Sequence, residues 1–490
     1  MQNITRRWFI GGAASFGAFA GCRMFEAHDF RLGGRPNVKV GIISDIHIRY
    51  VGEGKGYGGT STLQHTFEWF RDQGADAVLI AGDMADLGLV EQLQAVADIW
   101  YTVFPNDRAP DGRKVEKLFV YGNHDWEGAG YGGLSKQLYP DEAERARHVL
   151  RNDYGHWWEK IFNEAYSPIY RKDINGYAFI GQHWDGDERG GVTDRFGRIR
   201  DFMAKESIDP ALPFFYFQHP HPKDTCYGSW AWGHDRGMVS TTLSAYPNAV
   251  AFSGHSHYTL TDERSIWQGA FTSIGTSSLS YTGQPYDEYP SIGFENTESE
   301  GKDAQKFNAA KMMEKIDGLG SRQGMLMSVY DDCIVYRRRD LVNDLDLGDD
   351  WVMPLPTAES KPFAFAEHAK HFRAPEFPKG AKLTVTRTRA KNRSKVEKDA
   401  IRVVIPAPAV VREARSYRFD VTVTFADGKH TFKRVLARGF NHAPNLASVK
   451  DDTTCVFALD ELKAGPLRVE VVPVSCFGKR GQPLVADFAV

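Results

Sequence analysis

From residue 38 onwards, short apolar runs alternate with segments of helical periodicity. Val38–Ile43 and Ala77–Ala81 are runs of strand length, and the second is apolar throughout, as strands buried on both faces are. Residues 63–70 and 89–100 carry apolar side chains at helical spacing, and residues 118–121 return to a strand pattern. This succession predicts an α/β domain whose sheet is covered by helices on at least one face.

The same texture continues well beyond these first elements. Further short strands are expected at 177–180, 214–217 and 249–253. Between residues 141 and 165, apolar side chains recur at helical spacing and predict one long amphipathic helix. Residues 325–330 and 334–338 predict a β-hairpin. We therefore assign the α/β domain to residues 37–340.

The remainder of the chain has a different pattern. Residues 341–378 are rich in acidic groups and prolines and are expected to form a linker that lies against the first domain. Alternating strands without helical periodicity follow, at 383–385, 402–405, 417–425, 430–435, 454–459 and 467–474. They predict that residues 379–490 form a small all-β sandwich, whose closing stretch resembles a fibronectin type III or immunoglobulin-like module.

The N-terminal residues have the features of an export signal. Arg6 and Arg7 stand directly before an apolar run at 9–20. The run is too short to cross a hydrocarbon core of ~30 Å as a helix, so residues 1–22 are interpreted as a signal segment. The paired arginines resemble a twin-arginine (Tat-type) signal, which implies export of the folded protein to the periplasm or cell surface. Cys22 is a candidate for lipidation and membrane attachment; the alternative is plain cleavage nearby, with Cys22 removed or left free.

Charge and cysteine usage narrow the classes of partner. The chain has 60 basic and 63 acidic side chains and a formal net charge of −3, which gives no electrostatic basis for nucleic acid as the main partner. Besides Cys22 there are four cysteines, none at zinc-binding spacing: Cys226, Cys333, Cys455 and Cys476. In an exported protein the last two are candidates for a disulfide, with ordinary buried thiols as the alternative.

Polar residues of the metal-binding type stand where the predicted strands end. They are Asp45 and His47 after the first strand, Asp83 after the second, Asn123 and His124 after the third, His219 after the run at 214–217, and His255 and His257 after the run at 249–253. Open α/β sheets place ligands at the carboxyl edge of their strands, so these side chains are expected to converge. Carboxylate, imidazole and amide groups without thiolate suit Mn, Fe or Zn.

These residues fall in five blocks whose order resembles the calcineurin-like metallophosphoesterase superfamily. The blocks are Asp45-Ile46-His47, Gly82-Asp83, Gly122-Asn123-His124-Asp125, His219 and Gly254-His255-Ser256-His257. The resemblance covers roughly residues 38–280. It implies a β-sandwich core flanked by helices and a site that holds two divalent metal ions.

The resemblance also implies a role for each position. One ion would be bound by Asp45, His47 and His257. The other would be bound by Asn123, His219 and His255. Asp83 would bridge the two ions, and His124 would be catalytic without being a ligand.

Such a site has a known kind of chemistry. Two divalent ions about 3.5–4 Å apart can share one carboxylate and one hydroxide, whose pKa they lower. The bridging hydroxide would attack phosphorus while the ions neutralise charge on the phosphoryl oxygens. His124 is expected to supply a proton to the leaving group, and Asp125 is expected to orient its imidazole. A glycine precedes three of the blocks, because a sharp turn must bring the backbone close to the ions.

Two positions depart from the common pattern of the family. It usually shows adjacent histidines before proline, whereas the sequence here is Gln218-His219-Pro220-His221-Pro222. His219 lies directly at the strand end and is the expected ligand. His221 is left as a residue that supports the ligands or a substrate candidate, with an exposed loop histidine as the alternative. The purple acid phosphatase branch has a tyrosine three residues after the bridging aspartate. Here Asp86 occupies that position, so iron–tyrosinate chemistry is not expected.

One further histidine is a candidate for substrate contact. His183 follows the strand expected at 177–180 and lies near the same edge in the predicted order. Simple packing is the alternative explanation.

The sequence therefore predicts an exported, metal-dependent phosphoesterase that acts on a small-molecule phosphoester. Preference for phosphomonoesters or nucleotides and preference for phosphodiesters both remain open, because leaving-group contacts come from loops that the motifs do not constrain. A different alternative is a surface binding protein whose phosphatase domain is vestigial. That alternative predicts lost ligands, whereas every expected ligand position is intact.

Overall fold

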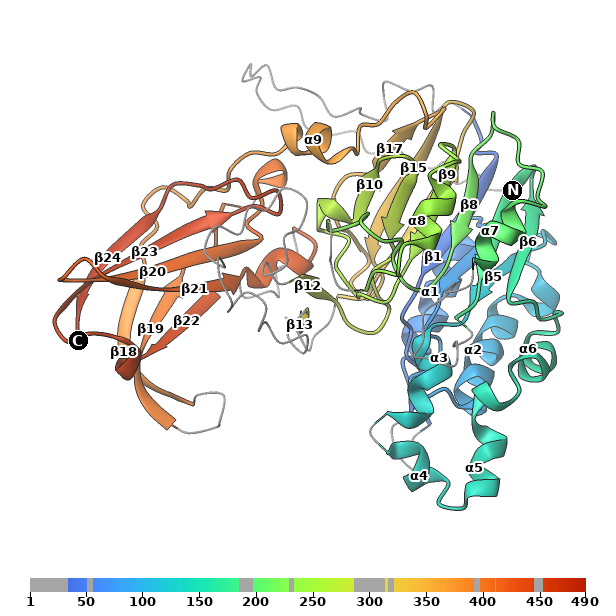
Figure 1. Ribbon diagram of the computed structural model, residues 1–490, viewed down its shortest axis with the longest axis horizontal. Helices are drawn as coiled ribbons and strands as arrows, with labels where there is room; N and C mark the ends of the chain where they lie inside the picture. The colour runs from blue at the N-terminus through green and yellow to red at the C-terminus, as the bar shows by residue number, and fades with distance from the viewer. Residues whose placement is uncertain are drawn as a thin grey trace, which may run out of the picture.

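The structure is a computed structural model of the 490-residue chain (Figure 1). It describes residues 34–50, 56–131, 133–184, 197–228, 233–285, 313–315, 321–391, 397–409, 411–444 and 453–490. The expected signal segment at 1–22, with Cys22, lies outside the described residues. Within the described ranges, none of the helices has both the length and the apolar character needed to cross a bilayer.

The first sheet is built around three parallel strands. Its order is β16 (Leu345–Asp346), β15 (Cys333–Asp340), β14 (Gln323–Val329), β1 (Val38–Ile43), β4 (Ala77–Ala81) and β5 (Glu116–Val120), with β17 (Trp351–Pro354) also paired to β15. Strands β1, β4 and β5 run parallel, whereas β14 pairs antiparallel with both β1 and β15. The predicted hairpin is therefore confirmed, and it extends the sheet on one side.

The second sheet repeats this arrangement. Its order is β10 (Ile266–Gln268), β11 (Thr272–Gly275), β9 (Ala249–Ser253), β8 (Phe214–Phe217), β7 (Tyr177–Gln182) and β6 (Ile169–Ile174). The four strands from β11 to β7 are parallel, and the two outer strands are antiparallel. The carboxyl ends of its parallel strands are therefore gathered at one edge.

The two sheets pack face to face. Val40 and Leu79 of the first sheet share one buried cluster with Phe215 and Phe252 of the second. Outside the first sheet, a second cluster joins it to α1 (Thr60–Asp72), α2 (Val90–Val103) and α6 (Tyr154–Phe162). Outside the second sheet lie α7 (Arg198–Met203) and α8 (Met238–Leu243). This helix–sheet–sheet–helix order confirms the expected calcineurin-like fold class.

The long helix expected between residues 141 and 165 is wrong. The chain forms α5 (Glu142–His148), a short 3₁₀ turn and then α6. Val149 has extended backbone angles and makes an isolated β-bridge to Leu89, and Asp153 caps α6. Only α6 packs into the core beside the first sheet, whereas α5 has no buried residues. Periodicity alone did not reveal the local break.

The segment expected to be a linker begins inside the first sheet. Strands β16 and β17 pair with β15, so these parts of 341–378 extend the sheet. The short helix α9 (Phe365–His368) follows and lies between the two parts of the molecule (Figure 1).

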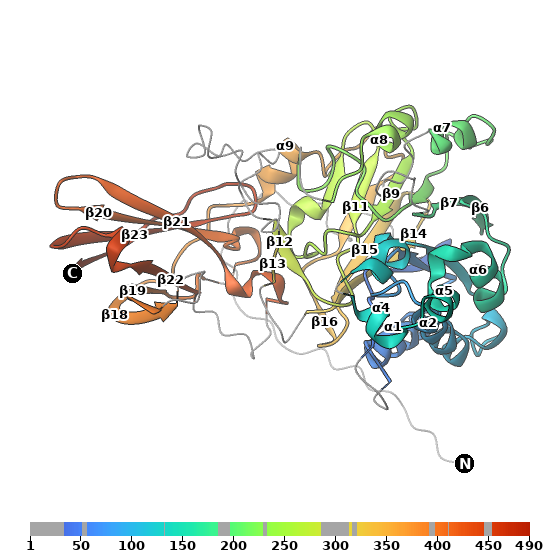
Figure 2. The ribbon, with the colours of Figure 1, turned by 60° about the horizontal axis from the view of Figure 1, so that its bottom comes forward.

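The C-terminal residues form two antiparallel sheets. One has the order β18 (Thr384–Lys391), β19 (Glu397–Ile405) and β22 (Thr453–Ala458); the other has β21 (His430–Leu436), β20 (Arg418–Phe425), β23 (Pro466–Val474) and β24 (Leu484–Ala489). Ile401 and Phe457 of the first sheet share a core with Val421 and Val469 of the second. The all-β character is confirmed, and the likeness to fibronectin type III modules stays a prediction. Figure 2 shows this domain at one end of the molecule.

The described short elements complete the fold. They are β2 (Arg49–Tyr50), β3 (Tyr57–Gly58), α3 (Asn123–Glu127), α4 (Leu134–Leu138), β12 (Gly283–Pro285) and β13 (Met313–Lys315). Cys226, Cys333, Cys455 and Cys476 are buried free thiols, so the structure has no bridge between the last two. Burial raises the pKa of the Cys455 thiol to about 12, as expected for a packed and unreactive group.

The two domains meet through buried polar contacts. Thr261 Oγ1 donates to the carbonyl of Phe440 at 2.5 Å, and Gln323 Nε2 donates to the carbonyl of Asn441 at 2.8 Å. The guanidinium carbon of Arg264 lies 4.7 Å from the ring centroid of Tyr417.

Candidate metal centre

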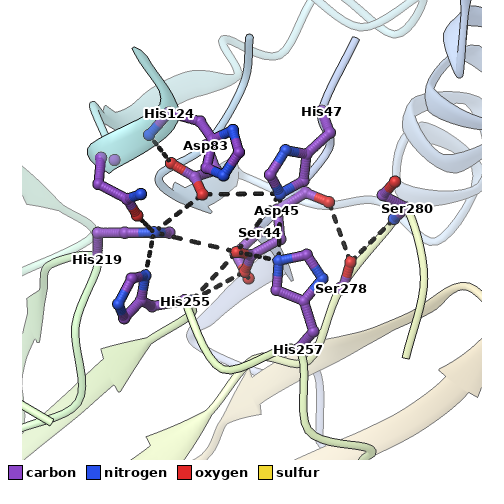
Figure 3. A network of polar contacts seen from close by, with 12 residues as sticks. Ser44, Asp45, His47, Asp83, His124, His219, His255, His257, Ser278 and Ser280 are labelled. Carbon is purple, nitrogen blue, oxygen red and sulfur yellow. Dashed lines mark hydrogen bonds and ion pairs between the residues drawn. The ribbon is translucent and has the colours of Figure 1, made fainter. Parts of the chain in front are cut away.

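The polar side chains that follow β1, β4, β5, β8 and β9 converge at the carboxyl edge of both sheets (Figure 3). Each strand is mostly buried, and the first ligand-type residue follows two or three positions after its end. The second sheet packs on the first with its parallel strands ending at the same edge. Residues more than 200 positions apart in sequence, such as Asp45 and His257, are thereby brought into contact.

One group gathers around the end of β1. His257 Nε2 lies 3.0 Å from Asp45 Oδ1 and 3.1 Å from His47 Nε2. His47 Nε2 is 3.6 Å from Asp83 Oδ2. One donor atom from each of these four residues lies within 4.8 Å of the others.

The second group gathers around His219. Its Nε2 lies 3.0 Å from Asn123 Oδ1, 3.1 Å from His255 Nδ1 and 3.1 Å from Asp83 Oδ2. The same Asp83 oxygen therefore borders both groups, at 3.1 Å from His219 and 3.6 Å from His47.

These spacings fit two metal ions. Neighbouring ligand atoms at ~2.1 Å from an ion in octahedral geometry lie roughly 3 Å apart. Five of the donor contacts are 3.0–3.1 Å long, and the contact of His47 Nε2 with Asp83 Oδ2 is longer, at 3.6 Å. Two like acceptor nitrogens 3.1 Å apart, as in His47 and His257, need a cation or proton between them. The residues present therefore fit a pair of divalent ions, with Asp83 between them.

The tautomers of the histidines support the same fit. The outer nitrogen Nδ1 of three rings faces a fixed acceptor: Asp86 Oδ1 for His47 at 3.0 Å, the carbonyl of Ala81 for His219 at 2.8 Å, and the carbonyl of Tyr281 for His257 at 3.1 Å. With the proton held on Nδ1, Nε2 is left with its lone pair towards the centre. This is the arrangement in which imidazole binds a metal.

The backbone at the site is conformationally unusual. Five of the converging residues have positive φ angles between 47° and 70°: Asp45, His47, Asp83, His255 and His257. Residues other than glycine rarely adopt this left-handed region, and each such position costs of order 1 kcal/mol or more. The surrounding structure holds these five residues in an unfavourable backbone conformation at the point where their side chains converge. Strain of this kind is typical of functional sites.

Two glycines allow the close approach of these turns. A Cβ atom at Gly122 would collide with the carboxylate of Asp83, and one at Gly254 would collide with the carboxylate of Asp45. The expectation that glycine precedes the blocks for steric reasons is confirmed at these positions.

The electrostatics keep the carboxylates ionised. Burial opposes ionisation of Asp83, but the imidazoles of His219 and His124 hold its pKa well below its usual range. Burial likewise opposes ionisation of Asp45, and His257 lowers its pKa to about 2.

The histidines divide according to their neighbours. Burial lowers the pKa of His47 to about 4 and that of His255 to about 3, so both are neutral and able to ligate. Burial also opposes protonation of His219, but Asp83 raises its pKa to about 9. Two buried carboxylates therefore draw positive charge to the point where a metal ion would lie.

His124 stands beside these groups with a partly exposed ring. Its Nδ1 lies 2.8 Å from the backbone carbonyl of Asp86, which fixes a proton on that nitrogen and leaves Nε2 for proton exchange. Its backbone N–H donates to Asp83 Oδ1 at 2.8 Å. The ring contacts His47 edge-on, with centroids 4.5 Å apart.

The expectation that Asp125 orients His124 is wrong. The carboxylate of Asp125 accepts instead from the backbone N–H groups of Gly122 and Ala85, each at 2.7 Å, and from Met84 at 3.3 Å. It therefore ties together the turns after β4 and β5. Burial, and secondarily the charge of Asp83, raise its pKa to about 7.

Asp86 has the orienting role that was expected of Asp125. It holds His47 through its carboxylate and His124 through its carbonyl, and its carboxylate lies 3.7 Å from Arg49 Nε. From the sequence, only the absence of tyrosine at this position was noted. A carboxylate three residues after the bridging aspartate was the available signal, because it is within reach of the His47 ring.

The structure does not place His183 at the site. Its ring is 1% exposed and packs against Trp158 and Tyr166, with centroids 4.6 Å and 5.0 Å away. Its Nδ1 accepts from the backbone N–H of Tyr121. Burial lowers its pKa to about 3. The packing alternative is therefore the correct one, and Trp184, whose ring lies 5.9 Å from that of His255, is the residue that reaches the site.

His221 is also buried and does not line a cleft. Its two ring nitrogens lie 2.6 Å from Ser253 Oγ and 2.7 Å from Ser256 Oγ. It thus fastens the turn that carries His255 and His257, which agrees with the expected role of a residue that supports the ligands. Because the ring is buried, it is neither a substrate contact nor an exposed loop residue.

The residues that line the other side of the centre were missed from sequence. Tyr281 lies with its ring 4.3 Å from that of His257, and Arg49 lies 5.7 Å from the Tyr281 ring. Ser278 Oγ donates to the carbonyl of Asp45 at 3.1 Å (Figure 3). Ser278 and Tyr281 lie in a loop, and Arg49 lies in the two-residue strand β2. None of them belongs to a recognisable pattern, so the sequence carried no signal for them.

Comparison with protein families matches residues 38–259 to the model described as calcineurin-like phosphoesterase. The matched span contains every residue of the two metal-type groups. With the buried Asp and His cluster, the match supports a dinuclear divalent metal site and identifies a phosphoester hydrolase. A search of curated proteins finds no match.

Solved structures give a distant likeness. A dimetal phosphatase from Danio rerio is 13% identical, with a TM-score of 0.33, over 65% of this chain and 99% of the other. A purple acid phosphatase from yellow lupin (Lupinus luteus) seeds is 15% identical, with a TM-score of 0.40, over 66% and 56%. At these values the likeness carries no argument about substrate.

Proposed function

We propose that this chain, whose residues 38–259 match the calcineurin-like phosphoesterases, is an exported enzyme that hydrolyses a small-molecule phosphoester with two divalent metal ions. The observation that carries the proposal is the convergence of two donor groups on one oxygen of Asp83. A carboxylate shared in this way has a use only if two cations lie beside it.

The ligand assignment follows the two groups. Asp45, His47 and His257 would hold one ion. Asn123, His219 and His255 would hold the other, with Asp83 between them. When bound, such ions supply Lewis-acid stabilisation of the phosphoryl oxygens and activation of water; Mn, Fe and Zn all suit this donor set.

The residues of the chain supply orientation and proton transfer. Asp86 holds His47 in the ligating tautomer and holds Nδ1 of His124. His124 Nε2 can then pass a proton to the departing oxygen, since the opposite nitrogen is anchored by a carbonyl. Burial of Asp45, Asp83 and His219 excludes bulk water from these charged groups, while His124 keeps a partly exposed ring.

The test is hydrolysis of p-nitrophenyl phosphate and bis-p-nitrophenyl phosphate by the protein loaded with Mn, Fe or Zn. We expect turnover of at least one ester and a loss of more than about 100-fold in kcat/KM for Asp83→Ala, since outer partners of metal ligands alone are worth 10- to 100-fold. Asp111→Asn, in an exposed loop, is the matched control. Full activity in Asp83→Ala would contradict the proposed site.

The same experiment separates the remaining alternatives. Turnover of the monoester alone indicates a phosphomonoesterase or nucleotidase, and turnover of the diester indicates a phosphodiesterase. A vestigial domain serving a surface binding protein predicts no turnover with any metal. The intact set of ligand positions favours the enzyme.

Export to the periplasm or cell surface rests on the sequence of the first 22 residues. The paired Arg6 and Arg7 support a twin-arginine signal, and Cys22 supports lipid attachment. Replacing both arginines by lysine should leave the precursor in the cytoplasm, as cell fractionation and immunoblotting would reveal. Unchanged export of that variant would rule out the twin-arginine route, and Cys22→Ser would separate lipidation from plain cleavage.

A further inference from the structure

Arg49 lies at the rim of the metal centre. Its Nη2 donates to Ser280 Oγ at 2.8 Å, and its Nε lies 3.7 Å from Asp86 Oδ1. Its guanidinium lies 5.7 Å from the ring centroid of Tyr281, and that ring packs on His257. Its side chain is 44% exposed, so it can meet a ligand from solvent.

Arg322 directly precedes β14 and lies beside the loop at 278–281, which also contains Ser280. The next residue, Gln323, donates its backbone N–H to the carbonyl of Ser278 at 2.9 Å, and this places the start of β14 against the loop at 278–281. Ser278 in turn contacts Asp45, so this loop connects Arg322 with the metal centre (Figure 3).

The guanidinium of Arg322 is short of partners. Its Nη1 is buried and has no hydrogen-bond partner among the described residues. The carboxylate of Asp340, whose charge acts on this guanidinium, already accepts from Ser321 and Asn343. Burial, with the neighbouring charge of Arg49, lowers the pKa of Arg322, so the two cations act on one another.

A pair of neighbouring cations with one buried unpartnered donor is costly unless an anion completes it. Guanidinium groups bind carboxylate and phosphoryl oxygens in a planar, two-pronged geometry. The reacting phosphoryl group would lie at the metal ions, whereas Arg49 contacts Tyr281, whose ring packs on His257. An anion held by the arginines would therefore belong to a different part of the substrate.

We propose that Arg49 and Arg322 form a subsite for a second anionic group of the substrate, a carboxylate or a further phosphoryl group, on the Tyr281 side of the metal centre. The inference rests on the proposed phosphoesterase function and narrows its substrates to phosphoesters with two separated anionic groups. A simple alkyl phosphate would leave the Arg322 donor without a partner.

Matched inhibitors test this subsite. 3-Phosphonopropionate carries a carboxylate, whereas 3-hydroxypropylphosphonate carries a neutral hydroxyl at the same position. Inhibition constants are measured against whichever p-nitrophenyl ester the metal-loaded protein hydrolyses. We expect the carboxylate to bind at least about 10-fold more tightly in the wild type, the effect of one charged hydrogen bond. In Arg322→Gln and Arg49→Gln that ratio should fall towards one.

Two further variants control the comparison. Arg337→Gln removes a partly exposed arginine on β15 that pairs with Asp346, and it should keep the wild-type ratio. Arg322→Lys keeps the charge and should retain part of the preference, which tests the subsite even if Arg322→Gln does not fold.

The two proposals fail in different ways. Equal inhibition constants in the wild type, or an unchanged ratio in Arg322→Gln, would overturn the subsite while ester hydrolysis stood. A wild type that hydrolyses neither reporter ester under any metal would overturn the phosphoesterase function. In that event, calorimetric titration with the same pair still measures whether the arginines prefer the carboxylate.

Discussion

At the scale of single residues, the site depends on the hydrogen-bond partners of the outer histidine nitrogens, which face away from the proposed metal ions. Asp86 is the most heavily used of these outer partners, since it holds both His47 and His124. The negative charge of Asp86 also stabilises the proton on Nδ1 of His47. Outer partners of this kind fix ring orientation and ligand basicity together.

We expect Asp86→Asn to lower kcat/KM about 10- to 100-fold and to weaken metal binding, because the amide holds His47 less firmly and carries no charge. Steady-state kinetics with a nitrophenyl ester and metal titration by calorimetry measure both effects. Asp111→Asn should behave as wild type. If Asp86→Asn keeps both activity and metal affinity, the orienting role is wrong.

The candidate metal ligands were predictable because each follows a buried strand, whereas their supporting partners were not. A run such as Ala77–Ala81 fixes where the strand ends and hence where Asp83 lies. Whether Asp125 or Asp86 supports His124 depends on how the turns after β4 and β5 meet, which is a tertiary contact. Substrate contact was the wrong choice among the alternatives for His183 and His221 for the same reason, since the burial of these rings is not visible from spacing.

At the scale of elements, Glu263 joins three segments of the first domain and its extension. It lies in a 3₁₀ turn and accepts from Arg338 of β15 at 2.9 Å and from Trp351 of β17 at 2.7 Å. His368 of α9 lies 3.5 Å away. Burial opposes ionisation of Glu263, but Arg338 lowers its pKa to about 2 from the ordinary 4.5.

Replacing Glu263 by glutamine should destabilise the protein at pH 7 by about 3 kcal/mol, because Arg338 is left buried without its charge partner. The folded-state pKa is depressed, so the stabilisation is complete above pH 4.5 and is lost as the pH falls towards 2. The difference in melting temperature between variant and wild type should therefore narrow over that range. Glu367→Gln, in an exposed pair with Lys370, is the control, and a gap independent of pH would contradict this account.

The main strands of the two packed sheets were predictable from the sequence. The short strands β16 and β17 and the break between α5 and α6 were not. Continuous apolar runs survive any tertiary context because they must be buried. Strands β16 and β17 have two and four residues, and they are strands only because the edge of β15 offers hydrogen-bonding partners. The break between α5 and α6 likewise depends on the bridge from Val149 to Leu89.

At the scale of the whole molecule, the centre exists only when both sheets are packed together. Asp45, His47 and Asp83 follow strands of the first sheet, while His219, His255 and His257 follow strands of the second. Bound ions would therefore stabilise the contact between the sheets as well as the loops.

Chelation of the metals should lower the melting temperature, and restoring Mn should raise it again. An ion present at 100 times its dissociation constant adds about 2.7 kcal/mol to the stability of the folded state. Differential scanning calorimetry with and without EDTA measures the shift. Asp83→Ala should show little response to either treatment, and a wild type that also fails to respond would mean that the folded site holds no metal.

The contact between the domains restricts how such proteins can diverge. Thr261 and Gln323 donate to carbonyl groups of the C-terminal domain. The Oε1 atom of Gln323 also accepts from Leu260 and Ser277, which lie in two loops beside the turns that carry the candidate ligands. A chimera that grafts a foreign β-domain after residue 378 would leave these buried donors without acceptors. The two halves are thus poor candidates for recombination as independent modules, and insertions are better tolerated far from this seam.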